Sequence, residues 1–581
     1  MPTCHNHKRE RMSALIVIKR TIERNYQLMA KKQTPLRIIP LGGLDGIGKN
    51  MTAFEYGNDM VLVDAGLMFP DDEQPGIDLI LPDYSYVLEN EEKLRGIIIT
   101  HGHEDHTGSL PYLLMDLARK VPIYASKLTL GFIEGKLAEH RLRSPKFRDV
   151  SNGTHVNLGA FSIDFFDMTH SIPGALGVYM RTPAGSVLHT GDFKLDQTPI
   201  DGVTPNYQAI NRFSTLGIDL LLSDSTNATR PGFTKSESAV GPALRHIIKN
   251  ASGRVIVASF SSQIHRLQQI CDASVAVGRK VVVTGRSMVQ NTKIARDLGY
   301  LKISQDDIID AFDAGDIPDD KVVVLCTGSQ GEPMSALSRM ANGEHRSFTI
   351  TANDTVIISA NPIPGNEKSV QGIINALSKI GCAVYDKSTT LVHVSGHGSQ
   401  EELKLMLAMT KPKYFMPVHG EAVHLRAHAK LAQQMGIRAD HIFVADNGDT
   451  LEMRGGKVSW GKPVESGVVY VDGLSITDAD PVVFRDRQKL ASDGIVTVVS
   501  TVSLRKKEVR DVEVSCRGVS FSADDISREA QERVKAHLNK QLSKEAMSLE
   551  TLRKGSRNTL SNYLWDQTRT RPMVIPFVME V

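Results

Sequence analysis

Four metal-binding side chains lie within six residues in the segment THGHEDHTG, residues 100–108: His101, His103, Asp105 and His106. The segment follows a short apolar run, Gly96–Ile99, of the kind that forms a buried strand. Buried imidazole and carboxylate groups are costly unless a partner or a metal ion holds them. Nitrogen and oxygen ligands without a nearby thiolate suit zinc or manganese, and several in one loop indicate two ions. A histidine-rich surface turn is the alternative.

Such a pair of ions predicts hydrolytic chemistry. Two divalent ions about 3.5–4 Å apart can share a hydroxide, lower its pKa and stabilise both the attacking and the leaving oxygen of a phosphodiester. Phosphodiester hydrolysis therefore suits the segment, although a dinuclear site does not by itself select the substrate.

A glycine-rich segment, GLDGIGKN (residues 43–50), matches seven of the eight positions of a phosphate-binding P-loop. The eighth position is Asn50, which has no hydroxyl for magnesium. The chain then continues into an expected strand, Met51–Tyr56, where a P-loop would open a helix. We therefore predict a tight turn here and no nucleotide site.

At these residues the chain resembles the metallo-β-lactamase superfamily, whose H-x-H-x-D-H loop is matched residue for residue. The other metal-site positions of that family are also filled: Asp64 in LVDAG, His170 in MTHSIPG, Asp192 in HTGDF and His419 in PVHGE. The resemblance implies two zinc ions, which manganese or magnesium could replace. It assigns His101, His103 and His170 to the first ion, Asp105, His106 and His419 to the second, Asp192 as a bridge, and Asp64 as an outer support of the loop.

The segment between Ser225 and His397 has its own α/β pattern and resembles the domain that β-CASP nucleases insert before the last metal ligand. Three motifs of that group are present: Asp224 in LLSDSTN, His397 in VSGHG and His419 in PVHGE. The resemblance implies that Asp224 and His397 assist proton transfer at the reacting oxygen. Two ordinary buried polar residues are the alternative.

Within the β-CASP group the chain is most similar to the ribonuclease J family. The segments GGLDGIGKNM (42–51), TGSQGEPMSAL (327–337) and HVSGHGSQEELKLML (393–407) carry this resemblance, together with an additional C-terminal region. It implies 5′-to-3′ exonuclease action on RNA with preference for a 5′-monophosphate, some endonuclease activity, and roles in RNA maturation and mRNA decay. A β-CASP nuclease acting on DNA and a weakly active RNA-binding scaffold subunit remain as alternatives.

Two clusters of small polar residues could form the pocket for a 5′-phosphate, because hydroxyl and backbone N–H groups can surround one phosphate and exclude three. They are Ser261, Ser262 and Gln263, and the run His393, Val394, Ser395, Gly396 and His397. Ordinary turns at strand ends are the alternative. Aromatic residues make up only 6% of the chain, which argues against an extended platform for base stacking.

The elements that must position these side chains alternate between strand and helix. Expected strands include 36–41, 51–56, 60–63, 96–100, 122–125, 255–259, 280–284, 321–326, 355–360 and 494–502, and expected helices 109–120, 127–142, 239–249, 263–276, 367–380 and a charged stretch at 524–554. We predict an α/β fold: a metallo-β-lactamase αββα sandwich with an inserted doubly wound β-CASP domain and a small C-terminal α+β domain. The boundaries are a flexible basic extension at 1–35, the lactamase domain at 36–235 and 398–475, the β-CASP domain at 236–397, a linker at 476–490 and the C-terminal domain at 491–581.

Composition places the chain among globular proteins of several domains, with 581 residues, 41% of them hydrophobic and 23% charged. No apolar run approaches the roughly 20 residues that a membrane span needs. Five cysteines without a CxxC pair favour a reducing cytoplasm. Residues 37–480 carry 42 Lys and Arg against 51 Asp and Glu, a net charge of −9, so that RNA binding would need metal ions or a local basic channel.

Two further expectations concern a structural ion and the assembly of the chain. Asp78 in GIDLILPD and Asp472 in YVDG could hold a structural calcium ion of the kind found in some relatives. The C-terminal domain is a candidate oligomerisation module, and the resemblance implies a homodimer or homotetramer. RNA and other RNA-decay proteins are the expected partners, and no membrane association is expected.

Overall fold

A computed structural model of the chain describes residues 34–71, 73–363, 365–473, 475–477, 481–544 and 548–581. These residues belong to two compact units: one runs to residue 69 and continues over 80–469, and the other combines 70–79 with 470–581. The predicted N-terminal extension lies outside the described residues as far as residue 33. No helix within the described ranges is long and apolar enough to cross a membrane.

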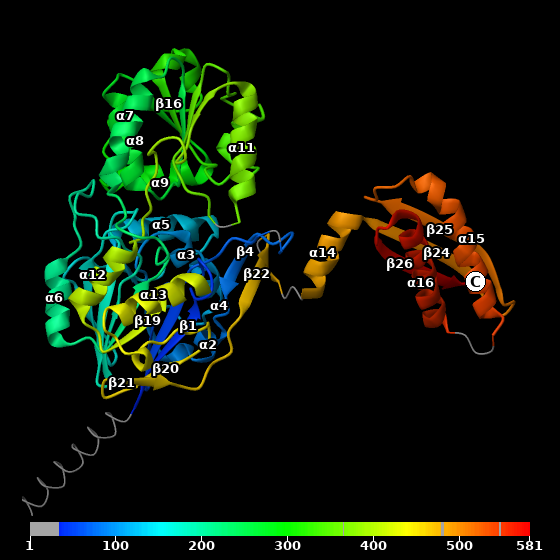
Figure 1. Cartoon of the computed structure of the whole chain (residues 1–581), viewed down its shortest axis with the longest axis horizontal. Helices are drawn as coiled ribbons and strands as arrows, with labels where there is room; N and C mark the ends of the chain where they lie inside the picture. The colour runs from blue at the N-terminus through cyan, green and yellow to red at the C-terminus, as the bar shows by residue number, and fades with distance from the viewer. Residues whose placement is uncertain (1–33, 72, 364, 474, 478–480, 545–547) are drawn as a thin grey trace, which may run out of the picture. The chain divides into compact units, whose positions relative to one another are not determined.

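Two sheets face each other in the first unit (Figure 1). The larger sheet has the strand order β21-β20-β1-β2-β3-β5-β6-β7, and the smaller one has the order β19-β12-β11-β10-β9-β8. The larger sheet comprises β1 (Leu36–Gly42), β2 (Met51–Tyr56), β3 (Asp59–Val63), β5 (Leu94–Ile98), β6 (Ile123–Ala125), β7 (Phe147–Asp149), β20 (Leu451–Arg454) and β21 (Lys457–Trp460). The smaller sheet comprises β8 (His155–Leu158), β9 (Phe161–Asp167), β10 (Leu176–Thr182), β11 (Gly185–His189), β12 (Leu220–Asp224) and β19 (Tyr414–Val418).

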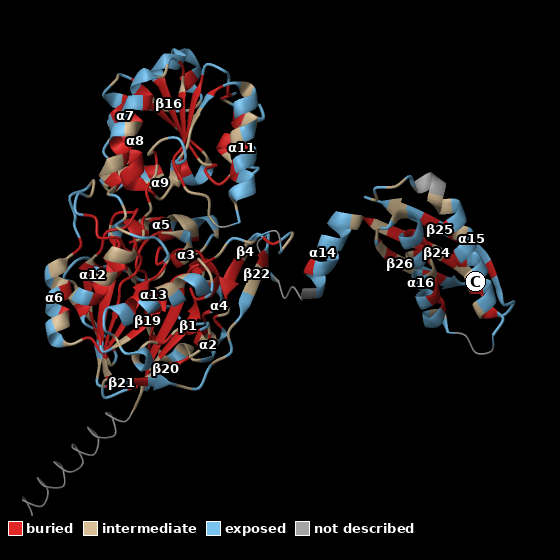
Figure 2. Ribbon diagram, viewed as in Figure 1, coloured by how far each residue is buried: buried red, intermediate tan, exposed pale blue. Residues whose placement is uncertain are grey.

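The main core of this unit lies between the two sheets, where Figure 2 shows buried strands. Ile38 and Phe54 of the larger sheet pack in one cluster with Val178 and Leu220 of the smaller sheet. On the other face of the smaller sheet a second cluster includes side chains of α6 (Tyr207–Leu216), α12 (Gln400–Thr410) and α13 (Ala422–Gln434). The remaining elements here are β4 (Leu79–Pro82), α2 (Ser85–Glu89), α3 (Glu104–Thr107), α4 (Leu110–Asp116) and α5 (Lys127–Glu139). The expected αββα sandwich is confirmed.

The inserted segment forms a parallel sheet with helices on both faces (Figure 1). Its order is β15-β14-β16-β13-β17-β18. Val255 and Val257 of β13 face α7, α8 and α9, whereas Ile256 and Ala258 face α10 and α11, so that the strand is apolar on both sides. The elements are α7 (Gly241–Asn250), β13 (Val255–Ala258), α8 (Ile264–Val275), β14 (Lys280–Thr284), α9 (Arg286–Asp297), β15 (Ile308–Ile309), β16 (Val322–Cys326), α10 (Ala336–Ala341), β17 (Thr355–Ile358), α11 (Glu367–Ile380) and β18 (Ala383–Tyr385). The expected doubly wound domain is confirmed.

The second unit contains a three-stranded sheet in which β24 (Ile495–Ser503) lies between antiparallel β25 (Glu508–Arg517) and parallel β26 (Met573–Glu580). Val496, Val498 and Val574 of this sheet pack against side chains of α15 (Ala523–Leu542) and α16 (Leu549–Thr568). The strands β22 (Val468–Asp472) and β23 (Ser475–Thr477) pair before it.

Two features of the second unit differ from the sequence expectations. Where a linker was expected at 476–490, the chain forms helix α14 (Pro481–Asp493), because a run rich in Arg, Gln, Lys, Leu and Ala has good helix propensity. The charged stretch at 524–554 is two helices, α15 and α16. The second begins after Ser548, whose side chain accepts a hydrogen bond from the N–H group of Thr551 at 3.2 Å.

Candidate metal centre

Six segments bring the predicted ligands and the predicted catalytic residues Asp224 and His397 together in the first unit. Residues 101–106 follow β5, His170 follows β9, Asp192 follows β11, Asp224 ends β12, His419 follows β19, and His397 precedes α12. Each segment leaves a strand end or begins a helix, so that regular elements anchor the side chains on at least one side. The side chains of the site thus come from positions between 101 and 419 of the chain.

The predicted ligands converge in two groups that meet at Asp192. His101, His103 and His170 form one group of mutually close ligand atoms, and Asp105, His106, Asp192 and His419 form the other. The Asp192 Oδ2 atom lies 3.2 Å from His106 Nε2 and 3.7 Å from His101 Nε2, one histidine from each group. A carboxylate in this position can contact both sites.

The spacing of the first group fits a zinc ion. His103 Nδ1 lies 3.1 Å from His101 Nε2 and 3.2 Å from His170 Nε2. Ligand nitrogens at 2.0–2.1 Å in a tetrahedron are about 3.3 Å apart, so the observed spacing is that of a shared metal. Ring nitrogens that face one another this closely otherwise repel each other when their lone pairs converge.

The second ring nitrogen of each of three ligand histidines has its own protein partner. His106 Nδ1 donates to Asp64 Oδ2 at 2.8 Å, and His170 Nδ1 donates to the carbonyl of Gly396 at 2.8 Å. His419 Nδ1 lies 2.5 Å from Thr226 Oγ1. These bonds fix the ring orientation and leave Nε2 free to face the site, as outer partners of metal ligands do.

Backbone geometry also holds the ligand loop in place. Asp64 has a positive φ of 62°, and its carboxylate accepts the N–H of Thr100 at 2.8 Å as well as the bond from His106. Gly66 passes so close to the loop that a Cβ atom there would lie 1.6 Å from the carbonyl oxygen of Asp105. Only glycine allows this approach of the two backbones.

The pKa values of the predicted ligands are shifted in different directions. Burial lowers the pKa of His103 to about 4, against the opposing effect of Asp105 and Asp192. Burial also opposes the charged form of His419, but Asp192, Asp105 and Asp224 outweigh it and raise the pKa of His419 to about 9. Burial would raise the pKa of Asp192, yet the surrounding histidines hold it well below its usual range. The carboxylates therefore remain ionised and form a negative field that protons or divalent cations balance.

Beside the ligands, Asp224 and His397 form a hydrogen-bonded pair. His397 Nδ1 donates to Asp224 Oδ2 at 2.8 Å and lies 3.9 Å from Asp192 Oδ2. Asp224 is almost fully buried, whereas the His397 side chain is 19% exposed. Burial lowers the pKa of His397, but Asp224 and Asp192 outweigh it and raise the pKa overall. The arrangement leaves Nε2 of His397 free to exchange a proton with a bound molecule.

The two predicted phosphate clusters approach each other through Arg266. Ser395 accepts a hydrogen bond from Asn227 at 2.9 Å, and Gly396 contacts His170, so that this run lies directly on the metal centre. Ser261, Ser262 and Gln263 precede helix α8, and Arg266 on its first turn lies 3.4 Å from His393 Nδ1. A shared phosphate pocket remains a prediction.

The two aspartates proposed for calcium lie in the second unit. Asp78 Oδ2 accepts the N–H of Gly473 at 2.7 Å, and Asp472 Oδ2 forms an ion pair with Arg487 at 3.0 Å. Their chain segments are joined by the hydrogen bond from Asp78 N–H to the carbonyl of Val471. Both carboxylates thus have protein partners, and the calcium site stays a prediction.

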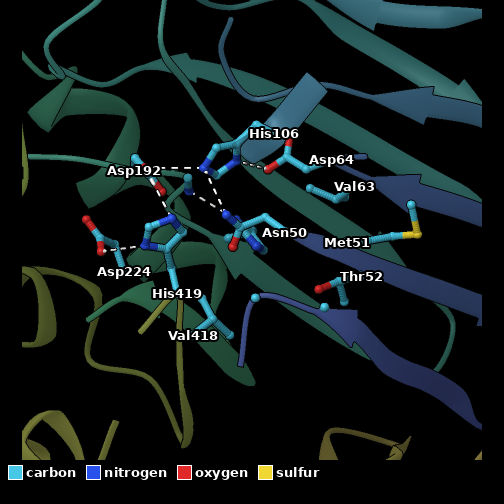
Figure 3. A pocket seen from close by; sticks show the side chains of 14 residues that line it. Asn50, Met51, Thr52, Val63, Asp64, His106, Asp192, Asp224, Val418 and His419 are labelled. Carbon is cyan, nitrogen blue, oxygen red and sulfur yellow. Dashed lines mark hydrogen bonds and ion pairs between the residues drawn. The ribbon is translucent and has the colours of Figure 1, made fainter. Parts of the chain in front are cut away.

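Sequence reasoning missed two side chains that contact the ligands. Asn50 donates to the carbonyl of Asp105 at 3.1 Å and lies 3.2 Å from His106 Nε2, where Figure 3 shows it beside the ring. The signal was the GLDGIGKN segment itself, which pairs with Gly420 next to His419. Thr226, two residues after Asp224, had no signal beyond the LLSDSTN motif.

Comparisons with known proteins cover nearly the whole chain. Family models match as the metallo-beta-lactamase superfamily at residues 44–220, the ribonuclease J beta-CASP domain at 252–377, the Zn-dependent metallo-hydrolase RNA specificity domain at 384–442 and the ribonuclease J C-terminal domain at 482–581. A solved structure of an Enterococcus faecalis protein of unknown function shares the fold, with a TM-score of 0.51 and 14% identity over 72% of this chain and 100% of that one.

Three curated relatives align over almost their full lengths. Ribonuclease J of Mycolicibacterium smegmatis is 41% identical over 94% of this chain and 97% of its own, and that of Thermus thermophilus is 40% identical over 94% and 96%. Ribonuclease J2 of Bacillus subtilis is 39% identical over 95% of this chain and 100% of its own. The chain belongs to the ribonuclease J family.

Proposed function

We propose that this chain is a two-zinc ribonuclease that degrades RNA in the 5′-to-3′ direction, prefers 5′-monophosphate ends and has additional endonuclease activity. The observation that carries the proposal is the convergence of seven predicted ligands into two groups, with Asp192 of one group 3.7 Å from His101 of the other. His101, His103 and His170 would hold one ion, and Asp105, His106 and His419 the other. Bound there, the ions would activate water and stabilise charge on the scissile phosphate.

The chain's own groups would then position the substrate and move protons. His397, oriented by Asp224, would act on a reacting oxygen through Nε2, in the manner of a histidine held by a carboxylate. The run from His393 to His397 and residues 261–263 would contact the terminal phosphate. We also propose zinc as the native metal, a cytoplasmic location, assembly into a homodimer or homotetramer through the second unit, and a role in RNA maturation and mRNA decay with other RNA-decay proteins.

The experiment for this proposal uses one RNA labelled at its 3′ end and prepared with a 5′-monophosphate, a 5′-triphosphate or a 5′-hydroxyl. Stepwise shortening that is fastest from the monophosphate end supports the exonuclease and the phosphate pocket. Equal internal cutting of all three RNAs would contradict both. A matched DNA strand in the same assay tests the alternative of a DNA nuclease, because the 2′-hydroxyl distinguishes the two substrates.

A pair of histidine variants tests the metal assignment. His103→Ala is expected to abolish cleavage and to lower the zinc content per chain, with the circular dichroism spectrum unchanged. His155→Ala is the matched control, because this histidine is exposed on β8, pairs with Asp164 and lies outside both ligand groups. Full activity of His103→Ala without bound metal would refute the two-metal proposal.

Truncation tests the assembly role of the second unit. A chain that ends before Pro481 is expected to elute from gel filtration at a smaller assembly size than the full chain. An unchanged assembly would contradict an oligomerisation role for the C-terminal domain.

A further inference from the structure

A short loop beside His397 holds its backbone rigidly while it exposes an aromatic ring. The loop, residues 230–235, connects the end of the first lactamase segment to the β-CASP domain. The N–H of Gln400 donates to the carbonyl of Arg230 at 3.0 Å, and the N–H of Glu401 donates to that of Gly232 at 3.1 Å. The loop is thereby fixed to the beginning of α12.

Thr234, the residue after Phe233, contacts the main chain of His397. Thr234 donates its N–H to Glu402 Oε2 at 2.7 Å and its hydroxyl to the carbonyl of His397 at 2.7 Å. Its neighbour is Phe233, whose Cα atom lies one residue spacing, about 3.8 Å, from that of Thr234. Phe233 is therefore the direct sequence neighbour of a residue that contacts the backbone of His397.

Phe233 is 65% exposed although the backbone on both sides of it is anchored. Pro231 restricts the entry to the loop, and Gly232 adopts a positive φ of 78° that favours glycine. Burying an apolar ring of this size lowers the free energy, but here the fold leaves the ring exposed to water. The backbone that carries the ring is thus already ordered, so binding costs little additional backbone entropy.

Positively charged residues precede and follow Phe233 in the sequence, within a chain body that is acidic overall. Arg230 and Lys235 are exposed on the same loop. Burial lowers the pKa of His424 on α13, and the nearby charge of Arg230 also lowers it, which places the Arg230 guanidinium near the N-terminal part of α13 and the His419 loop. An aromatic ring between two cations is an arrangement that suits single-stranded nucleic acid, with stacking on the base and ion pairs to the backbone.

We propose that Phe233 stacks on a nucleobase of the single-stranded RNA that leads into the metal centre, and that Arg230 and Lys235 contact the adjoining phosphates. The inference rests on the proposed ribonuclease function and adds a specificity-determining contact to it. Every base offers a π face, so this contact tolerates any sequence, as an enzyme that degrades RNA stepwise requires. The low aromatic content argued against an extended platform for base stacking. A contact with one aromatic ring is consistent with that expectation.

The test measures binding of the zinc-loaded full chain to a 5′-monophosphorylated, fluorescein-labelled RNA with phosphorothioate linkages that resist cleavage. Phe233→Leu is expected to raise Kd about 5- to 150-fold, the range reported for loss of one base–aromatic stack, whereas Phe233→Trp retains affinity. Phe312→Leu is the matched control, because Phe312 is 79% exposed in the β-CASP domain and has no predicted role. Equal affinity of Phe233→Leu and the unaltered chain would overturn the inference.

A scan of abasic RNAs then identifies the stacked base. Removing that base should weaken binding by the unaltered chain but leave binding by Phe233→Leu unchanged, a coupling that a merely structural residue would not show. Additive losses at every position would overturn the inference. If the unaltered chain cleaves unmodified RNA, such a failure concerns Phe233 alone, whereas a chain that neither binds nor cleaves RNA refutes the proposed function as well.

Discussion

A buried ion pair in the β-CASP domain gives the sharpest quantitative prediction. Arg266 is fully buried, and its Nε and Nη2 atoms donate to the two carboxylate oxygens of Glu237 at 2.6 and 3.0 Å. Its Nη1 atom donates to Ser359 Oγ at 2.6 Å and to the carbonyl of Val392 at 2.8 Å, and it lies 3.4 Å from His393 Nδ1. One guanidinium thus joins helix α8 to the start of the predicted phosphate-contacting run.

The size of the effect follows from what each substitution leaves behind. Arg266→Met leaves the carboxylate of Glu237, which is only 3% exposed, without its cation, and removing one partner of a buried pair costs about 3–5 kcal/mol. Glu237→Leu instead leaves the buried guanidinium of Arg266 without its carboxylate partner. The double variant removes both charges, so its cost should fall short of the sum of the single costs by ~1–3 kcal/mol.

Hydrogen exchange of the amides in α8 during urea titration measures the loss of stability around this helix. A local measurement is needed because a chain of several domains does not unfold in a single two-state step. Peptides from α13 provide the internal control. Arg438→Met is the matched variant, because Arg438 pairs with Asp440 on the surface and should leave exchange in α8 unchanged. Additive costs in the double variant, or protection of α8 unaltered by Arg266→Met, would refute the reasoning.

Three further predictions concern the metal ligands and acid stability. Gly66→Ala forces the backbone at Asp105 to move, so the zinc content should fall in the purified chain; full zinc occupancy would contradict the close approach. Asp64→Asn removes the carboxylate that orients His106 and should weaken zinc affinity about 10- to 100-fold in a competition titration with a chelator; an unchanged affinity would exclude this supporting role. Burial lowers the pKa of His428 to about 3, so the unfolded chain binds this proton more readily and stability is lost as the pH falls below about 6.5. His428→Asn should therefore remove on the order of 2–3 kcal/mol of the stability loss between pH 7 and pH 4.5, and urea unfolding curves with unchanged pH dependence would contradict it.

Hydrophobic periodicity and helix-ending residues predicted some helices and strands with their observed bounds. Helix α11 was expected at 367–380 and has these bounds, because an amphipathic run ends at Gly381 in the left-handed conformation. Strand β2 likewise has its expected bounds. No secondary structure was predicted for the linker at 476–490, where helix α14 begins at Pro481, since a polar stretch with few apolar positions offers little periodicity.

The ligand residues could be predicted because they lie in one dense motif and in short motifs that the family resemblance identifies. The contacts that orient them could not. Asn50 reaches residues 55 and 56 positions away, and Thr226 reaches His419 across 193 positions. No spacing rule within one strand or helix encodes such a meeting, because it depends on how the two sheets stack.

The run from His393 to His397, which we propose contacts the terminal phosphate, also contacts a predicted metal ligand. The carbonyl of Gly396 holds the His170 ring through Nδ1, while the next residue, His397, pairs with Asp224. A Cβ atom at position 396 would lie 2.6 Å from Cε1 of His170, so glycine is required for this fit. Any shift of the run on binding a terminal phosphate would therefore move its contacts with His170, a predicted ligand of the first metal group, and with Asp224 together. Under the proposed function, this arrangement would link recognition of the RNA end to the metal centre through a single peptide unit.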